Sequence, residues 1–115
     1  MMMKEMRAQL SETLDELMSK DDKLIVCDAD LACSSGLKPL FEKYPERSSN
    51  FGISEANMTA ACAGFSQTGL KPIMHSFCPF VTRRVMDQLY VSIGFAQNNL
   101  FVYASDPGYW SQYNG

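Results

Sequence analysis

The chain has 115 residues, of which 46% are hydrophobic and 20% charged, and its net charge at neutral pH is -3. These values are typical of an ordinary globular domain. The absence of a basic stripe argues against nucleic acid, and no apolar run is long enough to span a bilayer. The N-terminus lacks the apolar segment of a signal peptide, so we expect a cytoplasmic protein. The four cysteines form no C-x-x-C pair, which favours reduced core thiols over zinc ligands.

The first part of the chain predicts a helix followed by a buried strand. Apolar side chains recur at helical spacing over residues 6–18, and a polar turn at residues 20–23 ends that pattern. Residues 24–27 form a short continuous apolar run, as expected for a parallel strand that is buried on both faces. Asp28 and Asp30 follow this strand, where they either face a ligand at the carboxyl edge of the sheet or cap a turn.

The middle of the chain predicts two further helices. Ser34-Ser35 is expected to cap the first of them, and Pro45 ends it. Residues 51–53 predict a very short strand. A helix is then expected from residue 54 to about residue 67, with Gly69 at its exit. Several alanines and a glycine give this helix a small-residue face that suits close packing.

The last part predicts a strand at residues 71–75, a long helix at 80–96 and a strand at 100–104. This alternation of strands and helices predicts an α/β fold with a mainly parallel sheet and helices on both faces. Residues 106–115 predict a loop rich in aromatic residues and turn formers. We therefore expect one domain, residues 1–115, that is truncated at its C-terminal end.

Two segments that each follow a strand and open a helix carry the candidate chemistry. An acid in the first turn of a helix, such as Glu55, is often only a surface partner of the helix dipole. Phe77 and Phe80 lie three residues apart, on one side of a helical turn. They form either part of the core or an apolar wall for a flat heteroaromatic ring whose polar atom meets Glu55. His75 is predicted to be a half-buried strand histidine, and no dinucleotide or P-loop motif occurs.

Taken together, these segments resemble the pyrimidine-binding domain of transketolase-like enzymes, which depend on thiamin diphosphate. The resemblance runs in collinear order over nearly the whole chain, and its most specific part is a G-I-x-E-x-N-M string combined with F-x-x-F-x-x-R. It implies the thiamin diphosphate-binding fold. The segments that carry it are Asp28-Ala29-Asp30-Leu31, residues 50–58, residues 77–84 and Asp87-Gln88.

The resemblance implies a role for each of these residues. Glu55 matches the catalytic acid, whose carboxyl group hydrogen-bonds the pyrimidine N1′ and promotes the imino tautomer of the cofactor. Phe77 and Phe80 match the side chains that pack against the pyrimidine. The further cofactor-side positions are Asp30, Ile53 and Arg83, and the positions that match a sugar phosphate site are Ser34 and Arg7.

The resemblance also implies a partner. In this family the diphosphate and its Mg²⁺ or Ca²⁺ bind a separate domain with a G-D-G…N motif, which this sequence lacks, so no metal ligands are expected here. The chain therefore resembles the C-terminal section of a split transketolase that works in an oligomer with a separate N-terminal section. Family members commonly place a histidine where this chain has Ser105-Asp106, and an Asp-Gly-x-x-His stretch near its Asn114-Gly115. Ordinary pentose-phosphate specificity therefore does not follow.

The expected activity is that of a transferase that moves a two-carbon ketol unit from a ketose to an aldose, with sugar phosphates as substrates. The same domain occurs in 1-deoxyxylulose-5-phosphate synthase and in the β subunits of 2-oxoacid dehydrogenases, which remain alternatives. A non-catalytic α/β interaction module and a flavodoxin-like small-ligand binder are alternatives of a different class.

Overall fold

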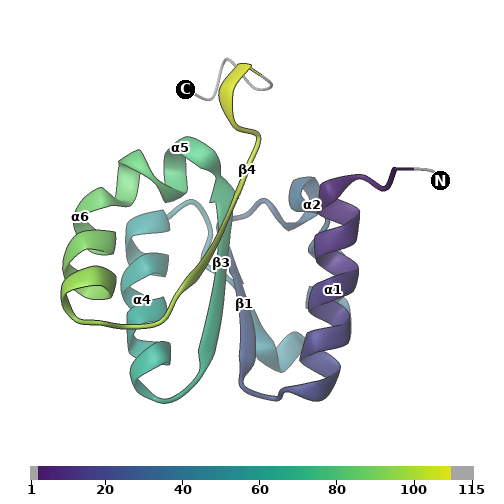
Figure 1. Cartoon of the computed structure of the whole chain (residues 1–115), viewed down its shortest axis with the longest axis horizontal. Coiled ribbons are helices and arrows are strands. Elements are labelled where there is room, and N and C mark those ends of the chain that lie inside the picture. Colours follow the sequence, from purple (N-terminus) through teal and green to yellow (C-terminus); the bar gives the residue numbers. More distant parts are fainter. Residues whose placement is uncertain (1–2, 110–115) are drawn as a thin grey trace.

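A parallel β-sheet organises the computed structural model, which describes residues 3–109 (Figure 1). Within that range four strands lie in the order β2-β1-β3-β4, and all three neighbouring pairs are parallel. The strands are β1 (Leu24–Asp28), β2 (Ser48–Asn50), β3 (Lys71–Phe77) and β4 (Phe101–Ser105). No helix of the described part is both long and apolar enough to cross a membrane.

Helices cover both faces of the sheet, as predicted. Figure 1 shows α1 and α4 on opposite sides of β1 and β3. One layer comprises α1 (Met6–Lys20), α2 (Ala32–Ser35) and α3 (Lys38–Lys43). The other layer comprises α4 (Glu55–Gln67), α5 (Cys78–Val81), α6 (Met86–Gln88) and η3 (Leu89–Phe95). The short turns η1 (Pro45–Arg47) and η2 (Arg83–Val85) complete the elements of residues 3–109.

Each face of the sheet has its own core because successive strand residues point in opposite directions. Val26 of β1 packs with Leu14 and Met18 of α1. Its neighbour Cys27 packs instead with Met58 and Cys62 of α4. The central strands are therefore apolar on both sides, which explains why β1 has a continuous apolar sequence rather than an alternating one.

Three local predictions are wrong. The short second strand lies at residues 48–50 instead of 51–53, because Gly52 adopts a φ of 69° and turns the chain. Ser34-Ser35 caps no helix: both residues lie inside α2, and α3 begins at Lys38 without a side-chain cap.

The predicted long helix at 80–96 is broken into α5, η2, α6 and η3. Thr82 has φ and ψ values of -120° and -88°, and its hydroxyl donates to the Cys78 carbonyl at 2.6 Å. In a regular helix that carbonyl would accept the Thr82 amide, so the hydroxyl competes with the helical ladder. The break sets the directions of the two arginines that follow.

Candidate active site

Glu55 is buried at the beginning of α4, with only 3% of its surface exposed. Its Oε1 accepts a hydrogen bond from Ser76 Oγ at 3.1 Å, and its Oε2 accepts one from Arg84 Nη1 at 3.2 Å. Ser76 is itself fully buried near the end of β3. The surface alternative for Glu55 is therefore excluded, because a dipole partner at the surface would be solvated. The fold places an acidic group inside the protein with two hydrogen-bond donors.

Two aromatic rings and a guanidinium lie next to this carboxylate. Phe77 and Phe80 are half-buried, and their ring centroids are 6.2 Å apart. The Arg84 guanidinium stacks over the Phe80 ring, 3.8 Å from its centroid, while it also contacts Glu55. A flat group with nitrogen donors thus lies between an acid and an aromatic face. An aminopyrimidine is also flat, and it carries an amino donor beside ring nitrogens that accept, so it suits an aromatic face next to a carboxyl group.

Arg84, rather than Arg83, reaches Glu55. Arg83 is exposed in η2, and no hydrogen bond or ion pair of its side chain occurs within residues 3–109. Arg83 was selected as a cofactor-side residue from the family resemblance, in which it matches a position near the pyrimidine. No spacing signal favours Arg84, because the helix breaks at Thr82 between Phe80 and the two arginines.

Two other predicted cofactor-side residues lie near the carboxyl edge of the sheet without contacting Glu55. Ile53 is 80% exposed, two residues before Glu55. Asp30 is exposed with a φ of 65°, and its Oδ1 accepts a hydrogen bond from Asn50 Nδ2 at 3.1 Å. Asn50 Oδ1 accepts the Asp30 amide at 3.0 Å in return. Asp30 therefore links the ends of β1 and β2.

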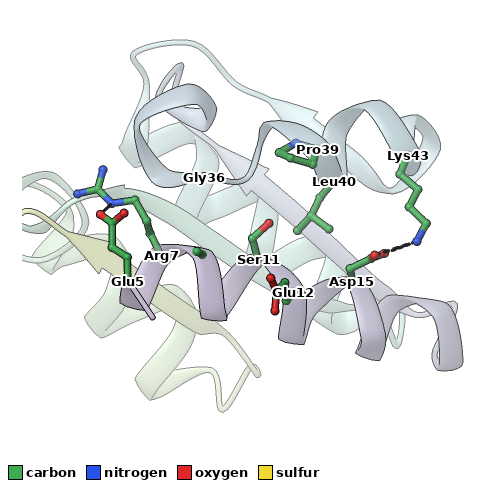
Figure 2. A pocket seen from close by; sticks show the side chains of 10 residues that line it. Glu5, Arg7, Ser11, Glu12, Asp15, Gly36, Pro39, Leu40 and Lys43 are labelled. Atoms are coloured by element: carbon green, nitrogen blue, oxygen red, sulfur yellow. Dashed lines mark hydrogen bonds and ion pairs between the residues drawn. The ribbon is translucent and has the colours of Figure 1, made fainter. Parts of the chain in front are cut away.

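The predicted pair Arg7 and Ser34 is brought together by the fold. Arg7 Nη1 donates to the Ser34 backbone carbonyl at 2.6 Å, and Arg7 Nε pairs with Glu5 at 2.6 Å. Figure 2 shows Arg7 and Glu5 at one end of a groove of about 490 Å³ between α1 and α3, with Lys43 and Asp15 paired at the other end. Both of these cations already have a carboxylate partner on or beside α1.

A second polar cluster lies on the opposite face of the sheet from Glu55. His75 was predicted to be half-buried, but its side chain is fully buried. Its Nδ1 lies 2.6 Å from Asp28 Oδ2, and its Nε2 lies 2.9 Å from Ser105 Oγ. The ring also packs on Tyr103, with centroids 4.6 Å apart. Sequence reasoning missed this cluster because its members come from three strands whose lateral order the sequence alone does not give.

Asp28 has a capping role as well, which was one of the two alternatives for it. Its Oδ1 accepts a hydrogen bond from the Leu31 amide in the loop that leaves β1. The residues of the described part include no group of three or more His, Cys, Asp or Glu side chains that could hold a metal ion.

Comparison with known proteins identifies the family of this chain. Residues 2–108 match the family model described as the transketolase pyrimidine binding domain. The chain belongs to this family. Members of the transketolase family depend on thiamin diphosphate, which agrees with the arrangement around Glu55.

The relatives include two transketolase subunits or sections and a synthase. The 6-deoxy-6-sulfo-D-fructose transketolase subunit of Clostridium sp. strain MSTE9 is 38% identical over 104 residues, which cover 90% of this chain and 32% of the relative. A putative transketolase C-terminal section of Methanocaldococcus jannaschii is 33% identical over 105 residues, 91% of this chain and 33% of the relative. A 1-deoxy-D-xylulose-5-phosphate synthase of Rhodopirellula baltica is 30% identical over 82 residues, 71% of this chain and 13% of the relative.

A solved structure shows the same fold. It is described as a split gene transketolase in an inactive beta4 tetramer, and it aligns with a TM-score of 0.77 and 32% identity. The alignment covers 85% of this chain and 33% of that one. This chain therefore spans about a third of the length of these transketolase relatives.

Proposed function

We propose that this chain supplies the pyrimidine-binding side of a thiamin diphosphate-dependent transketolase, which transfers a two-carbon ketol unit from a ketose to an aldose. A separate N-terminal section would hold the diphosphate and its Mg²⁺ or Ca²⁺ and close the site in an oligomer located in the cytoplasm. The observation that carries the proposal is the buried Glu55 carboxylate, held by Ser76 and Arg84 beside two phenylalanines.

Each of these residues has a definite task toward the cofactor. Ser76 fixes one oxygen of Glu55, so the other oxygen is directed to the place where Arg84 now lies. A pyrimidine ring nitrogen accepts a hydrogen bond, so the Glu55 carboxyl would donate to it in the place that Arg84 now occupies, and Arg84 would move aside. Phe77 and Phe80 exclude water from the ring, and burial strengthens the hydrogen bond from Glu55. When bound, thiamin diphosphate supplies nucleophilic chemistry at its thiazolium carbon, and the protein supplies orientation.

Ketol transfer is favoured over the synthase alternative by the pattern of relatives. The two transketolase relatives match 90% and 91% of this chain at 38% and 33% identity. The synthase relative matches 71% at 30% identity. Because one transketolase relative is named for a sulfonated fructose, we propose a ketose donor with either a phosphate or a sulfonate at its far end.

Hydrogen–deuterium exchange at the thiazolium carbon of the bound cofactor tests this function. The chain is assembled with its partner section, thiamin diphosphate and Mg²⁺, and exchange is followed by proton NMR. Glu55→Ala is expected to slow exchange by at least about 100-fold, which is typical of losing an acid–base group. Gln67→Ala, at the exposed end of α4, is the matched control and should exchange at the wild-type rate.

Two results would count against the proposal. Wild-type exchange in Glu55→Ala would show that this carboxyl group has no part in activating the cofactor. The absence of any cofactor circular-dichroism band in the assembled wild-type protein would favour a non-catalytic interaction module instead.

A further inference from the structure

Arg84 makes two contacts at once, and both engage groups that a bound pyrimidine ring would need. Its Nη1 donates to Glu55 Oε2 at 3.2 Å, and its guanidinium stacks over the Phe80 ring, 3.8 Å from the centroid. Ser76 already donates to Glu55 Oε1, so Oε2 is the carboxylate oxygen that is left for a ligand. A side chain of the protein itself therefore takes up both the available oxygen of the acid and the face of one aromatic ring.

A guanidinium and an aminopyrimidine compete for such a place because both are flat. A guanidinium pairs with a carboxylate in one plane and also stacks on aromatic faces. A flat heteroaromatic ring uses the same two surfaces, the aromatic face for stacking and the carboxyl group for orientation. Two flat groups cannot lie on one face of Phe80 and against one oxygen of Glu55 at the same time. Occupation by Arg84 and occupation by a ring therefore exclude each other.

The Arg84 side chain is free to leave this place without moving the backbone. It is 46% exposed, whereas Glu55 is 3% exposed, so a released guanidinium is hydrated at once. Its turn, η2, lies between two residues with non-helical backbone angles, Thr82 and Val85, and the fully buried Val85 anchors it. Within the part of the chain that the structure describes, the Arg84 side chain makes no other hydrogen bond or ion pair.

The same pair has a reason to form whenever the ring is absent. A buried carboxylate that loses a partner is left as an uncompensated charge, which is strongly unfavourable. We propose that Arg84 is an autoinhibitory contact, which closes the pyrimidine site by occupying Glu55 Oε2 and the Phe80 face and opens it by turning into solvent. The proposal rests on the thiamin diphosphate-dependent function given above.

The cofactor affinity of the assembled enzyme measures this effect. The apparent Kd rises by the reciprocal of the fraction of open molecules, so about one open molecule in ten raises it about tenfold. Arg84→Ala is therefore expected to bind thiamin diphosphate about tenfold more tightly than wild type, by isothermal titration calorimetry with the partner section and Mg²⁺. Lys38→Ala is the matched control, because it removes an exposed cation of α3 in the opposite layer. Equal or weaker binding by Arg84→Ala would overturn the proposal.

A second test uses the purified chain and needs neither cofactor nor partner. Arg84→Ala leaves the site without its own guanidinium, so methylguanidinium at millimolar concentration should bind there and raise the Tm. Wild type should respond no more than it does to the same concentration of sodium chloride. Adding Glu55→Gln should abolish the response, because the amide replaces a charged acceptor with a neutral group. The same Tm shift in wild type and Arg84→Ala would contradict self-occupation of the site.

Nitrogen-15 labelling of arginine follows the contact in the wild-type protein, even if Arg84→Ala fails to fold. The sequence contains four arginines, so the guanidinium spectrum is simple. Addition of thiamin diphosphate to the assembled enzyme should convert one guanidinium from restricted to free rotation, and an unchanged spectrum would overturn the proposal. Absent wild-type C2 exchange would refute the function itself. Normal exchange with unchanged cofactor affinity in Arg84→Ala would refute the autoinhibitory contact alone.

Discussion

Arg84→Met is the substitution that most directly tests the arrangement around Glu55. It removes the guanidinium that donates to Glu55 Oε2 at 3.2 Å but keeps an apolar side chain against Phe80. The isolated chain then retains a buried carboxylate with Ser76 as its remaining donor. We expect a less stable protein, because the buried Glu55 carboxylate loses one of its two hydrogen-bond donors.

The size of the loss follows from the exposure of the two partners. A hydrogen bond to a charged group contributes about 1.5–3 kcal/mol, and an exposed ion pair contributes about 0–1 kcal/mol. Glu55 is 3% exposed and Arg84 is 46% exposed, so the pair lies between these cases. We expect Arg84→Met to lower the free energy of unfolding by about 1.5 kcal/mol, which corresponds to a fall in Tm of roughly 6 °C for a domain of this size.

Thermal unfolding of the purified chain, followed by circular dichroism, measures this effect. Arg83→Met is the matched control: because Arg83 is exposed, its change should stay within about 0.5 kcal/mol. Adding Glu55→Gln to Arg84→Met removes the unpaired charge, so the double variant should be more stable than the sum of the single effects by about 1 kcal/mol. Equal Tm values for Arg83→Met and Arg84→Met would refute the assignment of Arg84 as the partner of Glu55.

Two further predictions concern thiols and acid stability. A thiol reagent should modify the exposed Cys33 in the native protein and leave the buried Cys27 and Cys62 unmodified. A hydrogen bond with Cys62 and burial raise the pKa of the Cys27 thiol, which disfavours its reactive thiolate. Peptide mass mapping checks this, and early labelling of Cys27 would contradict it. The hydrogen bond from Lys43 lowers the pKa of Asp15 in the folded protein from its ordinary value of 3.8. In acid the unfolded chain therefore binds more protons than the folded one, and stability falls as the pH drops toward the folded pKa. Asp15→Asn should therefore flatten the decrease in Tm below about pH 5, and identical acid slopes for the two proteins would show that the pair contributes nothing.

The regular elements were predictable because their apolar patterns directly reflect burial. β1 is apolar at consecutive positions because both of its faces are covered, and α1 and α4 show helical spacing. β2 was misplaced because its sequence, Ser48–Asn50, has no apolar signal: it is an edge strand held by backbone pairing with β1. The break at Thr82 depends on one side-chain hydrogen bond, which no periodicity reveals.

The candidate site was predictable only where the local sequence determines which way a side chain points. Glu55, Phe77 and Phe80 were found because their motifs combine fixed spacing with strand-to-helix junctions. Which of Arg83 and Arg84 reaches Glu55 depends on how the chain turns after α5, and the sequence alone does not give that turn. The roles of these residues toward cofactor and substrate stay predictions until the variants are measured.

The consecutive placement of His75 and Ser76 has a consequence for how such an enzyme can change. A displacement of β3 along its own axis would alter the Ser76–Glu55 and the His75–Ser105 contacts together. Substitutions that reshape the packing under β3 should therefore disturb the surroundings of Glu55 and of His75 at the same time. Changes in β4 or α1, which border the cavity beside Ser105, are expected to leave the Ser76–Glu55 contact in place.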